Sequence, residues 1–243
     1  MVKASKSKKA ETTRLITLFA IGAAVAAVAV IGWNYYQASV DQTELAETEG
    51  GKTDPGMVEL MQAGPLEEMV IGSADAPNTI VEYASMTCSH CAKFQIDVFP
   101  ELKTKYLDTG KAKYILRAFP LDGLAVAAFM VARCAGSDRY YPMIEALFET
   151  QSVWALQGSE GKDKLLQISR QAGFSKERFD ECLADEELFK KIVAVRDRGN
   201  EAFQIDSTPT FFVNGKRLSD HKLENFDEVL EGGDKTAGAS PSQ

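Results

Sequence analysis

Histidine and cysteine are scarce in this chain of 243 residues. Its four cysteines are too few for a small scaffold that is held together by disulfides. His90 and His221 are the only histidines, so a zinc site built on Cys88 and Cys91 would lack a second pair of ligands. We therefore expect no structural metal, and the sequence predicts no cofactor.

A basic surface is also missing from most of the chain. Residues 1–14 hold five of the 27 basic residues and one of the 35 acidic ones, which leaves 22 basic and 34 acidic side chains and a net charge of −12. Such an acidic body repels nucleic acid, and no basic patch follows residue 14. Nucleic acid is therefore excluded as a partner.

The long hydrophobic run of the chain lies near its N-terminus. Residues 15–33 carry no charge, follow the basic segment and end at a Trp/Tyr cluster, and as a helix they would span nearly ~30 Å. This pattern predicts a transmembrane signal-anchor over residues 15–36, with one pass through the inner membrane, a cytoplasmic segment 1–14 and a periplasmic catalytic domain.

Two alternatives to this anchor remain open. Ala27 and Ala29 resemble a secretory cleavage site, and a cleaved chain would be a soluble periplasmic protein. The third alternative is a buried helix of a soluble protein. Both the anchor and the cleaved signal deliver the body to a compartment where disulfides persist.

The segments on either side of residues 65–232 differ from them in composition. Residues 37–64 are acidic and contain several glycines, which is typical of a flexible tether. Residues 233–243 have no apolar side chain larger than alanine and are predicted to be a disordered tail.

The first part of the body, residues 65–121, combines two strands and a helix. Residues 79–83 and 113–119 are β-branched and aromatic runs that predict strands. Between them, residues 89–107 repeat apolar side chains at three and four positions, which predicts a helix, and Pro100 predicts a kink in it. This order predicts a right-handed parallel βαβ unit.

The remainder is a helical segment followed by a hairpin and a helix. Residues 122–185 are predicted to be helices, with Asp122 and Ser175 as N-caps. In residues 186–232 we expect a long helix, two short strands joined by the turn Asn214-Gly215, and a last helix. The fold class is therefore α/β, with a helical insertion between the βαβ half and the hairpin half.

Cys88-Ser89-His90-Cys91 lies at the junction of a predicted strand and a predicted helix. The first thiol is then at the helix N-terminus, where free N–H groups and the helix dipole favour the thiolate. The second thiol lies one turn further, and His90 between them adds positive charge. These effects stabilise the reduced form and make the disulfide a stronger oxidant.

Glu82 and Pro209 are two further candidates for this site. Glu82 shares a side of its strand with Ile80, so burial could raise its pKa and suit it to carry a proton for the cysteines. The alternative is a glutamate that faces solvent from an edge strand. Pro209 removes a backbone donor at the start of a strand and leaves neighbouring groups for an extended substrate, unless it is an ordinary strand-entry proline.

Three segments together resemble the DsbA-like branch of the thioredoxin superfamily: residues 79–83, the Cys88–Cys91 motif and residues 207–215. The resemblance extends over residues 67–232 and includes the helical insertion. It implies a thioredoxin-like fold and the activity of a thiol–disulfide oxidoreductase. Ser89 departs from the family's best-known oxidant, which has proline there, whereas His90 is retained.

The resemblance also implies a role for each site residue. Cys88 exchanges disulfides with the substrate, Cys91 resolves the intermediate, and Glu82 matches the family's buried acid. Pro209 is expected to be cis and to face the disulfide, and Thr208 is expected to tune the hydrogen bonding of the thiolate.

Cys134 and Cys182 are a second pair of cysteines. Some DsbA-like proteins resemble this chain in having a disulfide in the helical part. A bridge between the two residues would add roughly 4 kcal/mol on the chain-entropy model, and two buried free thiols are the alternative.

These features predict an extracytoplasmic enzyme that oxidises cysteine pairs in exported proteins. The resemblance implies a quinone-coupled membrane reoxidant of the DsbB type as its partner. One alternative is a membrane-tethered disulfide reductase or isomerase. Another is a copper-binding chaperone that uses Cys88, Cys91 and His90, although the chain has no Met/His cluster.

Overall fold

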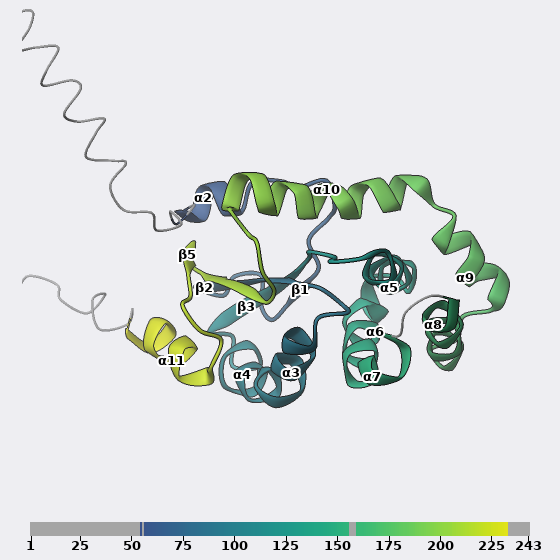
Figure 1. Ribbon diagram of the computed structural model, residues 1–243. Coiled ribbons are helices and arrows are strands. Elements are labelled where there is room, and N and C mark those ends of the chain that lie inside the picture. Colours follow the sequence, from purple (N-terminus) through teal and green to yellow (C-terminus); the bar gives the residue numbers. More distant parts are fainter. Residues whose placement is uncertain (1–53, 55, 156–158, 233–243) are drawn as a thin grey trace, which may run out of the picture. The chain divides into compact units, whose positions relative to one another are not determined.

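The computed structural model describes residues 54, 56–155 and 159–232 (Figure 1). The predicted cytoplasmic segment 1–14, the predicted anchor 15–36, most of the predicted tether 37–64 and the predicted tail 233–243 lie outside the described residues.

The prediction of a membrane anchor is corrected. Among the described residues, no helix is both long enough and apolar enough to cross a membrane. Helix α5 (Gly123–Cys134) is strongly apolar but has 12 residues, and α10 (Glu186–Phe203) has 18 residues but carries many charged side chains. The transmembrane and signal-anchor assignment, and with it the single-pass location, is therefore not retained.

A five-stranded sheet with the order β1-β3-β2-β4-β5 carries the site. Its strands are β1 (Val70–Ile71), β2 (Asn78–Ala84), β3 (Ala112–Ala118), β4 (Thr210–Val213) and β5 (Lys216–Arg217). Strand β2 runs parallel to β3 and antiparallel to β4, so Glu82 pairs with Leu116 on one side and Phe211 on the other. Glu82 is thus on the central strand of the sheet, and not on an edge strand.

The crossover between β2 and β3 is a broken helix. It comprises α3 (Ser89–Asp97), α4 (Phe99–Leu102) and a π-helical segment, Lys103–Leu107. The break falls at Val98, and Pro100 lies in the first turn of α4, where its missing N–H costs no helical hydrogen bond. The sequence predicts this kink but not the short strand β1, whose two residues are too few for a periodic signal.

Helices cover both faces of the sheet (Figure 1). Helices α3, α4 and α11 (Leu223–Gly232) lie on one face, and α2 (Gly56–Leu60) and α10 lie on the other. Successive strand residues point to opposite faces, so Phe211 packs in the core with Phe94 and Phe226, whereas Phe212 packs with Phe203 on the other side. The core that includes Phe211 also contains Cys88 and Cys91.

The predicted helical segment contains five helices: α5, α6 (Ser137–Glu149), α7 (Gln151–Trp154), α8 (Ser159–Gln171) and α9 (Lys176–Leu183). Asp122 caps α5 by accepting a hydrogen bond from the N–H of Ala125, and Ser175 caps α9 by accepting from the N–H of Arg178. Both caps are those that the sequence predicts. Helix α6 packs against α3, so the insertion adjoins the helix that carries the cysteines.

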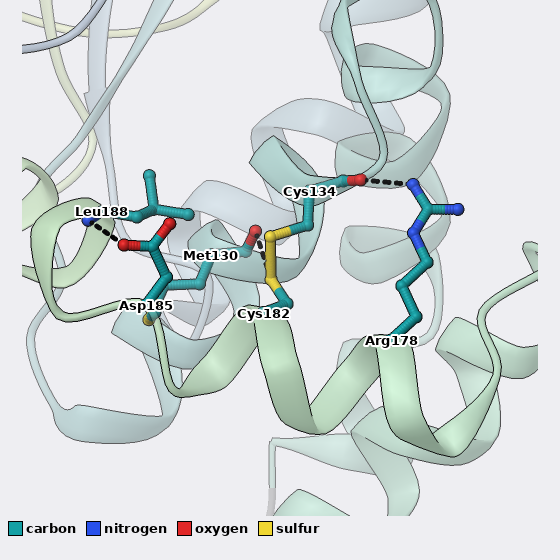
Figure 2. The surroundings of a disulfide bond; sticks show 6 residues. All are labelled: Met130, Cys134, Arg178, Cys182, Asp185 and Leu188. Atoms are coloured by element: carbon teal, nitrogen blue, oxygen red, sulfur yellow. Dashed lines mark hydrogen bonds between the residues drawn. A yellow bond between two sulfur atoms is a disulfide. The ribbon is translucent and has the colours of Figure 1, made fainter.

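A disulfide joins the first and last helices of this insertion (Figure 2). It links Cys134 to Cys182, whose Cα atoms are 6.1 Å apart. The Arg178 guanidinium donates a hydrogen bond of 2.6 Å to the carbonyl oxygen of Cys134, and the carbonyl oxygen of Met130 lies 3.2 Å from Cys182 Sγ. The bridge therefore cross-links α5 to α9.

Replacing both Cys134 and Cys182 by alanine should lower the free energy of unfolding by about 4 kcal/mol, because the bridge closes a loop with a sequence separation of 48. Urea denaturation of the non-reduced proteins measures this loss. Disulfide exchange at Cys88 should persist at temperatures where the variant is folded. Recovery of both thiols in free form from the non-reduced wild-type protein would contradict the bridge.

Gly215 lies in the β4–β5 turn and packs against the start of α2. Asn214 and Gly215 have φ values of +52° and +82°, as a two-residue hairpin turn requires. A Cβ atom on Gly215 would clash with backbone atoms of Gly56 and Met57.

The Gly215→Ala variant should therefore lose about 2–4 kcal/mol of stability, since the strained φ adds about 1–2 kcal/mol to the clash. Gly110→Ala is the matched control, because Gly110 has a φ of +72° but nothing within 4 Å of an added Cβ atom. Equal losses for the two variants in urea denaturation would contradict the contact with α2.

Candidate active site

Cys88 and Cys91 flank the first turn of α3. Cys88 is the N-cap of this helix, with extended backbone angles of φ −80° and ψ 119°. Both cysteines are unbridged thiols in this structure. Cys88 is 9% exposed and Cys91 is fully buried, so Cys88 is the sulfur that a substrate can reach.

The surroundings of Cys88 favour its thiolate and lower its pKa to about 5. The largest cause is a hydrogen bond from the Cys91 thiol, followed by one from Thr208 and by the backbone N–H groups of Cys91 and His90. Partial burial opposes this shift. The predicted effect of the helix N-terminus thus has a concrete origin in two N–H groups of the first turn.

Thr208 approaches the sulfur atom of Cys88 from outside α3. Cys88 Sγ lies 3.3 Å from the carbonyl oxygen of Thr208 and can donate to it while protonated. The Thr208 hydroxyl is buried and has no hydrogen-bond partner among the described residues. Once Cys88 has lost its proton, this hydroxyl is the available donor. The Thr208–Pro209 peptide bond is cis, and Pro209 is half-buried.

Cys91 differs from Cys88 in its proton affinity. Burial raises the pKa of the Cys91 thiol far above its usual range, and the interactions with Cys88 and Glu82 raise it further. A thiolate at this position therefore takes up a proton readily when it is formed.

Glu82 is a buried acid that interacts with Cys91. Burial raises its pKa to about 8, against the lowering effect of hydrogen bonds from Tyr114 and Gln95. Both of these bonds reach Glu82 Oε2, whereas Oε1 has no partner among the described residues. Glu82 is thus largely protonated at neutral pH, and it interacts electrostatically with the Cys91 thiol.

Tyr114 and Gln95 are members of this site that the sequence analysis missed. The Gln95 amide donates bonds of 2.8 Å to both Glu82 Oε2 and the Tyr114 hydroxyl. Gln95 lies four residues after Cys91 and so shares its helix face, and Tyr114 lies on β3, the parallel neighbour of the strand that carries Glu82. Helical spacing could have indicated Gln95. Tyr114 required the register of β2 and β3.

His90 contributes to the site through its backbone. Its side chain is exposed, and its N–H donates to Cys88. Among residues 54, 56–155 and 159–232, no group of three or more His, Cys, Asp or Glu side chains could hold a metal ion. The structure therefore brings Cys88, Cys91, Glu82 and Thr208 together, and places the Cys134–Cys182 bridge in the insertion.

A CxxC thiol pair at the start of the helix after the central strand, facing a residue bound to a cis-proline, defines a redox protein of the thioredoxin fold. The Thioredoxin family model matches residues 66–232. Alpha-DsbA1 of Wolbachia pipientis has a similar structure, with a TM-score of 0.66 and 30% identity over 76% of this chain and 98% of that protein. The chain belongs to the thioredoxin family, in its branch of DsbA-like thiol–disulfide oxidoreductases.

Two further relatives agree with this membership. Disulfide bond formation protein D of Bacillus subtilis is 29% identical over 67% of this chain and 73% of its own length. A Rickettsia bellii protein, provisionally named a protein-disulfide oxidoreductase, is 30% identical over 68% of this chain. The match spans 63% of that relative's length. The predicted fold class and family are therefore confirmed.

Proposed function

We propose that the chain oxidises pairs of cysteines in exported proteins, outside the cytoplasm. The observation that carries this proposal is the contrast between the two thiols of the motif. Cys88 is held as a thiolate, with a pKa of about 5, and this stabilises the reduced enzyme relative to its disulfide. A disulfide whose reduced form is stabilised is an oxidant.

The reaction begins with a substrate thiolate that attacks Cys88 Sγ of the oxidised enzyme. A bond forms between the substrate sulfur and Cys88, and the Cys88–Cys91 bond breaks. Cys91 leaves as a thiolate and takes up a proton, for which we propose Glu82 as the donor. The proton on Glu82 and the raised pKa of Cys91 favour this transfer.

The second step releases the product. Another thiolate of the substrate attacks the substrate sulfur of the mixed disulfide, and Cys88 leaves as the thiolate that Thr208 and the first turn of α3 stabilise. The substrate gains a disulfide, and the enzyme gains two electrons. A two-electron acceptor must restore the enzyme, and we propose a quinone-coupled membrane protein of the DsbB type for this role.

The Cys134–Cys182 disulfide supports a location outside the cytoplasm, because such bridges persist in oxidising compartments. A reductase is less favoured, since its CxxC pair needs a stable disulfide and hence a thiol with less thiolate character. A copper chaperone is less favoured because no third ligand adjoins Cys88 and Cys91 among the described residues.

The experiment mixes the oxidised full-length protein with a reduced peptide that contains two cysteines. We expect stoichiometric formation of the peptide disulfide, and complete loss of this reaction in Cys88→Ser and in Cys91→Ser, neither of which can form the enzyme disulfide. When Cys91→Ser is instead mixed with the oxidised peptide, its Cys88 thiolate should attack the peptide disulfide, release one peptide thiol and accumulate as a mixed disulfide. The double variant Cys134→Ala/Cys182→Ala is the control and should still oxidise the peptide.

The glutathione equilibrium of the wild-type protein decides between oxidant and reductase. A reduction potential near that of DsbA, about −120 mV, would support the proposal. A potential near that of thioredoxin, about −270 mV, would overturn it in favour of a reductase.

A further inference from the structure

A side chain of the helical insertion binds the backbone of the segment that leads from β2 to Cys88. Residues 85–88 connect β2 to α3, and the carbonyl group of Cys88 accepts the first hydrogen bond of α3, from the N–H of Ala92. The amide nitrogen of Gln151 donates to both carbonyl oxygens, at 2.8 Å to Met86 and 2.9 Å to Cys88. One NH₂ group thus uses its two hydrogens on carbonyls that are two residues apart.

Gln151 is itself fixed in place. It is the first residue of α7, in the helical insertion, and it is 9% exposed, so water has little access to replace its bonds. Trp154 anchors the same short helix, because it is fully buried and its indole N–H donates to the carbonyl oxygen of Leu147 at 2.7 Å. The amide is therefore presented to residues 85–88 by a packed element.

A second side chain at the start of the insertion holds the residue between those two carbonyls. The Thr87 hydroxyl donates to Asp122 Oδ2 at 2.7 Å, while Oδ1 of the same carboxylate caps α5. Residues 86, 87 and 88 are thus each bonded to the insertion. Of the two contacts, only the one from Gln151 reaches the backbone of Cys88.

We propose that Gln151 is a positioning residue that sets the thiolate geometry of Cys88. The Cys88 carbonyl accepts from Gln151 and from the N–H of Ala92 in the first turn of α3, so these two bonds fix the peptide plane that follows Cys88. That plane determines whether Cys88 Sγ meets the N–H groups of His90 and Cys91. Loss of the Gln151 amide removes its hydrogen bond to the Met86 carbonyl and leaves the Cys88 carbonyl with the N–H of Ala92 alone, so the peptide plane after Cys88 is held less firmly.

The test replaces Gln151 by methionine in the full-length protein, which keeps the length of the side chain and removes its donors. In a Cys91→Ala background, absorbance of the thiolate should show an upward shift of the Cys88 titration. With both cysteines present, the glutathione equilibrium should move about tenfold toward the enzyme disulfide, since a less stable thiolate makes a weaker oxidant.

Trp154→Phe is the matched control. It breaks one buried hydrogen bond in the same helix without touching residues 85–88, so it should lower thermal stability and leave the Cys88 titration and the glutathione equilibrium unchanged. If Gln151→Met fails to fold, Gln151→Asn provides the same test, because its shorter amide cannot reach both carbonyls.

A folded Gln151 variant with the wild-type titration and equilibrium would overturn the proposal. So would an equal shift in Trp154→Phe, because the effect would then follow from the stability of α7. The inference rests on the redox chemistry proposed for Cys88. The two proposals fail separately, because the glutathione equilibrium compares variant and wild type even where the wild-type protein oxidises no peptide.

Discussion

Replacing Glu82 by glutamine should stabilise the reduced protein by about 3 kcal/mol at pH 7. The pKa of Glu82 is raised from 4.5 to about 8 by burial. At neutral pH, ionisation of Glu82 therefore lowers the free energy of the unfolded chain but not that of the folded protein. Each pKa unit corresponds to about 1.4 kcal/mol. Glutamine keeps the shape of the side chain and removes this cost. Urea denaturation of the reduced proteins measures the difference.

Because the folded protein raises the pKa of Glu82, the contribution of this residue to stability depends on pH in a defined direction. For a raised pKa, the stability of the wild-type protein is fully present below about pH 4.5 and is lost as the pH rises through about 8. The advantage of Glu82→Gln should therefore be small at pH 4 and grow to about 5 kcal/mol at pH 9. Glu101→Gln, at an exposed position on α4, is the control and should stay within about 0.5 kcal/mol. A gain in stability that is independent of pH would refute this account.

Replacing Cys88 by serine should destabilise the reduced protein by about 3 kcal/mol at pH 7. The pKa of Cys88 is lowered from 9.0 to about 5, chiefly by the hydrogen bond from the Cys91 thiol. Stability from a lowered pKa is fully present above about pH 9 and is lost as the pH falls through about 5. The loss caused by the substitution should thus grow to about 5 kcal/mol above pH 9 and vanish near pH 4.

The oxidised wild-type protein is the control for Cys88, because a disulfide sulfur cannot ionise. Its unfolding should lack this gain in stability with rising pH. The contributions of Glu82 and Cys88 have opposite signs over nearly the same range, so they largely cancel in the reduced wild-type protein. The contribution of each residue to the free energy of unfolding must therefore be measured with the variant of that residue. Identical pH profiles for reduced Cys88→Ser and the reduced wild-type protein would rule out a stabilised thiolate.

Local signals in the sequence were sufficient for the scaffold of the site. The β-branched runs and the dipeptide Asn214-Gly215 predict β2 and the β4–β5 hairpin close to their observed bounds. The apolar spacing after Ser89 predicts where α3 begins, and the helix predicted over residues 89–107 is divided into α3, α4 and a π-helical segment. Asp122 and Ser175 mark helix starts because a cap is a contact within three residues. Strand alternation left two alternatives for Glu82, a buried side chain and a side chain that faces solvent from an edge strand. Its position on the central strand β2 decides for the buried one.

The contacts that tune the chemistry could not be predicted in this way. Tyr114, Gln95 and Gln151 act through hydrogen bonds to groups 13 to 65 residues away, and no local pattern distinguishes them from other polar residues. The sequence likewise did not indicate that His90 acts through its backbone N–H, which donates to Cys88, while its side chain is exposed. Each of these contacts depends on strand register or on the packing of the insertion against α3.

The position of β4 has a consequence for the order in which the redox centre is completed during synthesis. Thr208, which meets Cys88, lies 120 residues further along the chain, and Phe211 covers Glu82 from the strand that follows. A nascent chain that has reached only α10 therefore has β2 at the edge of its sheet and a Cys88 thiol without its threonine partner. In such a chain the carboxyl group of Glu82 is still accessible to water, because Phe211 does not yet cover it. The redox centre is thus completed only after β4 has been synthesised and has paired with β2.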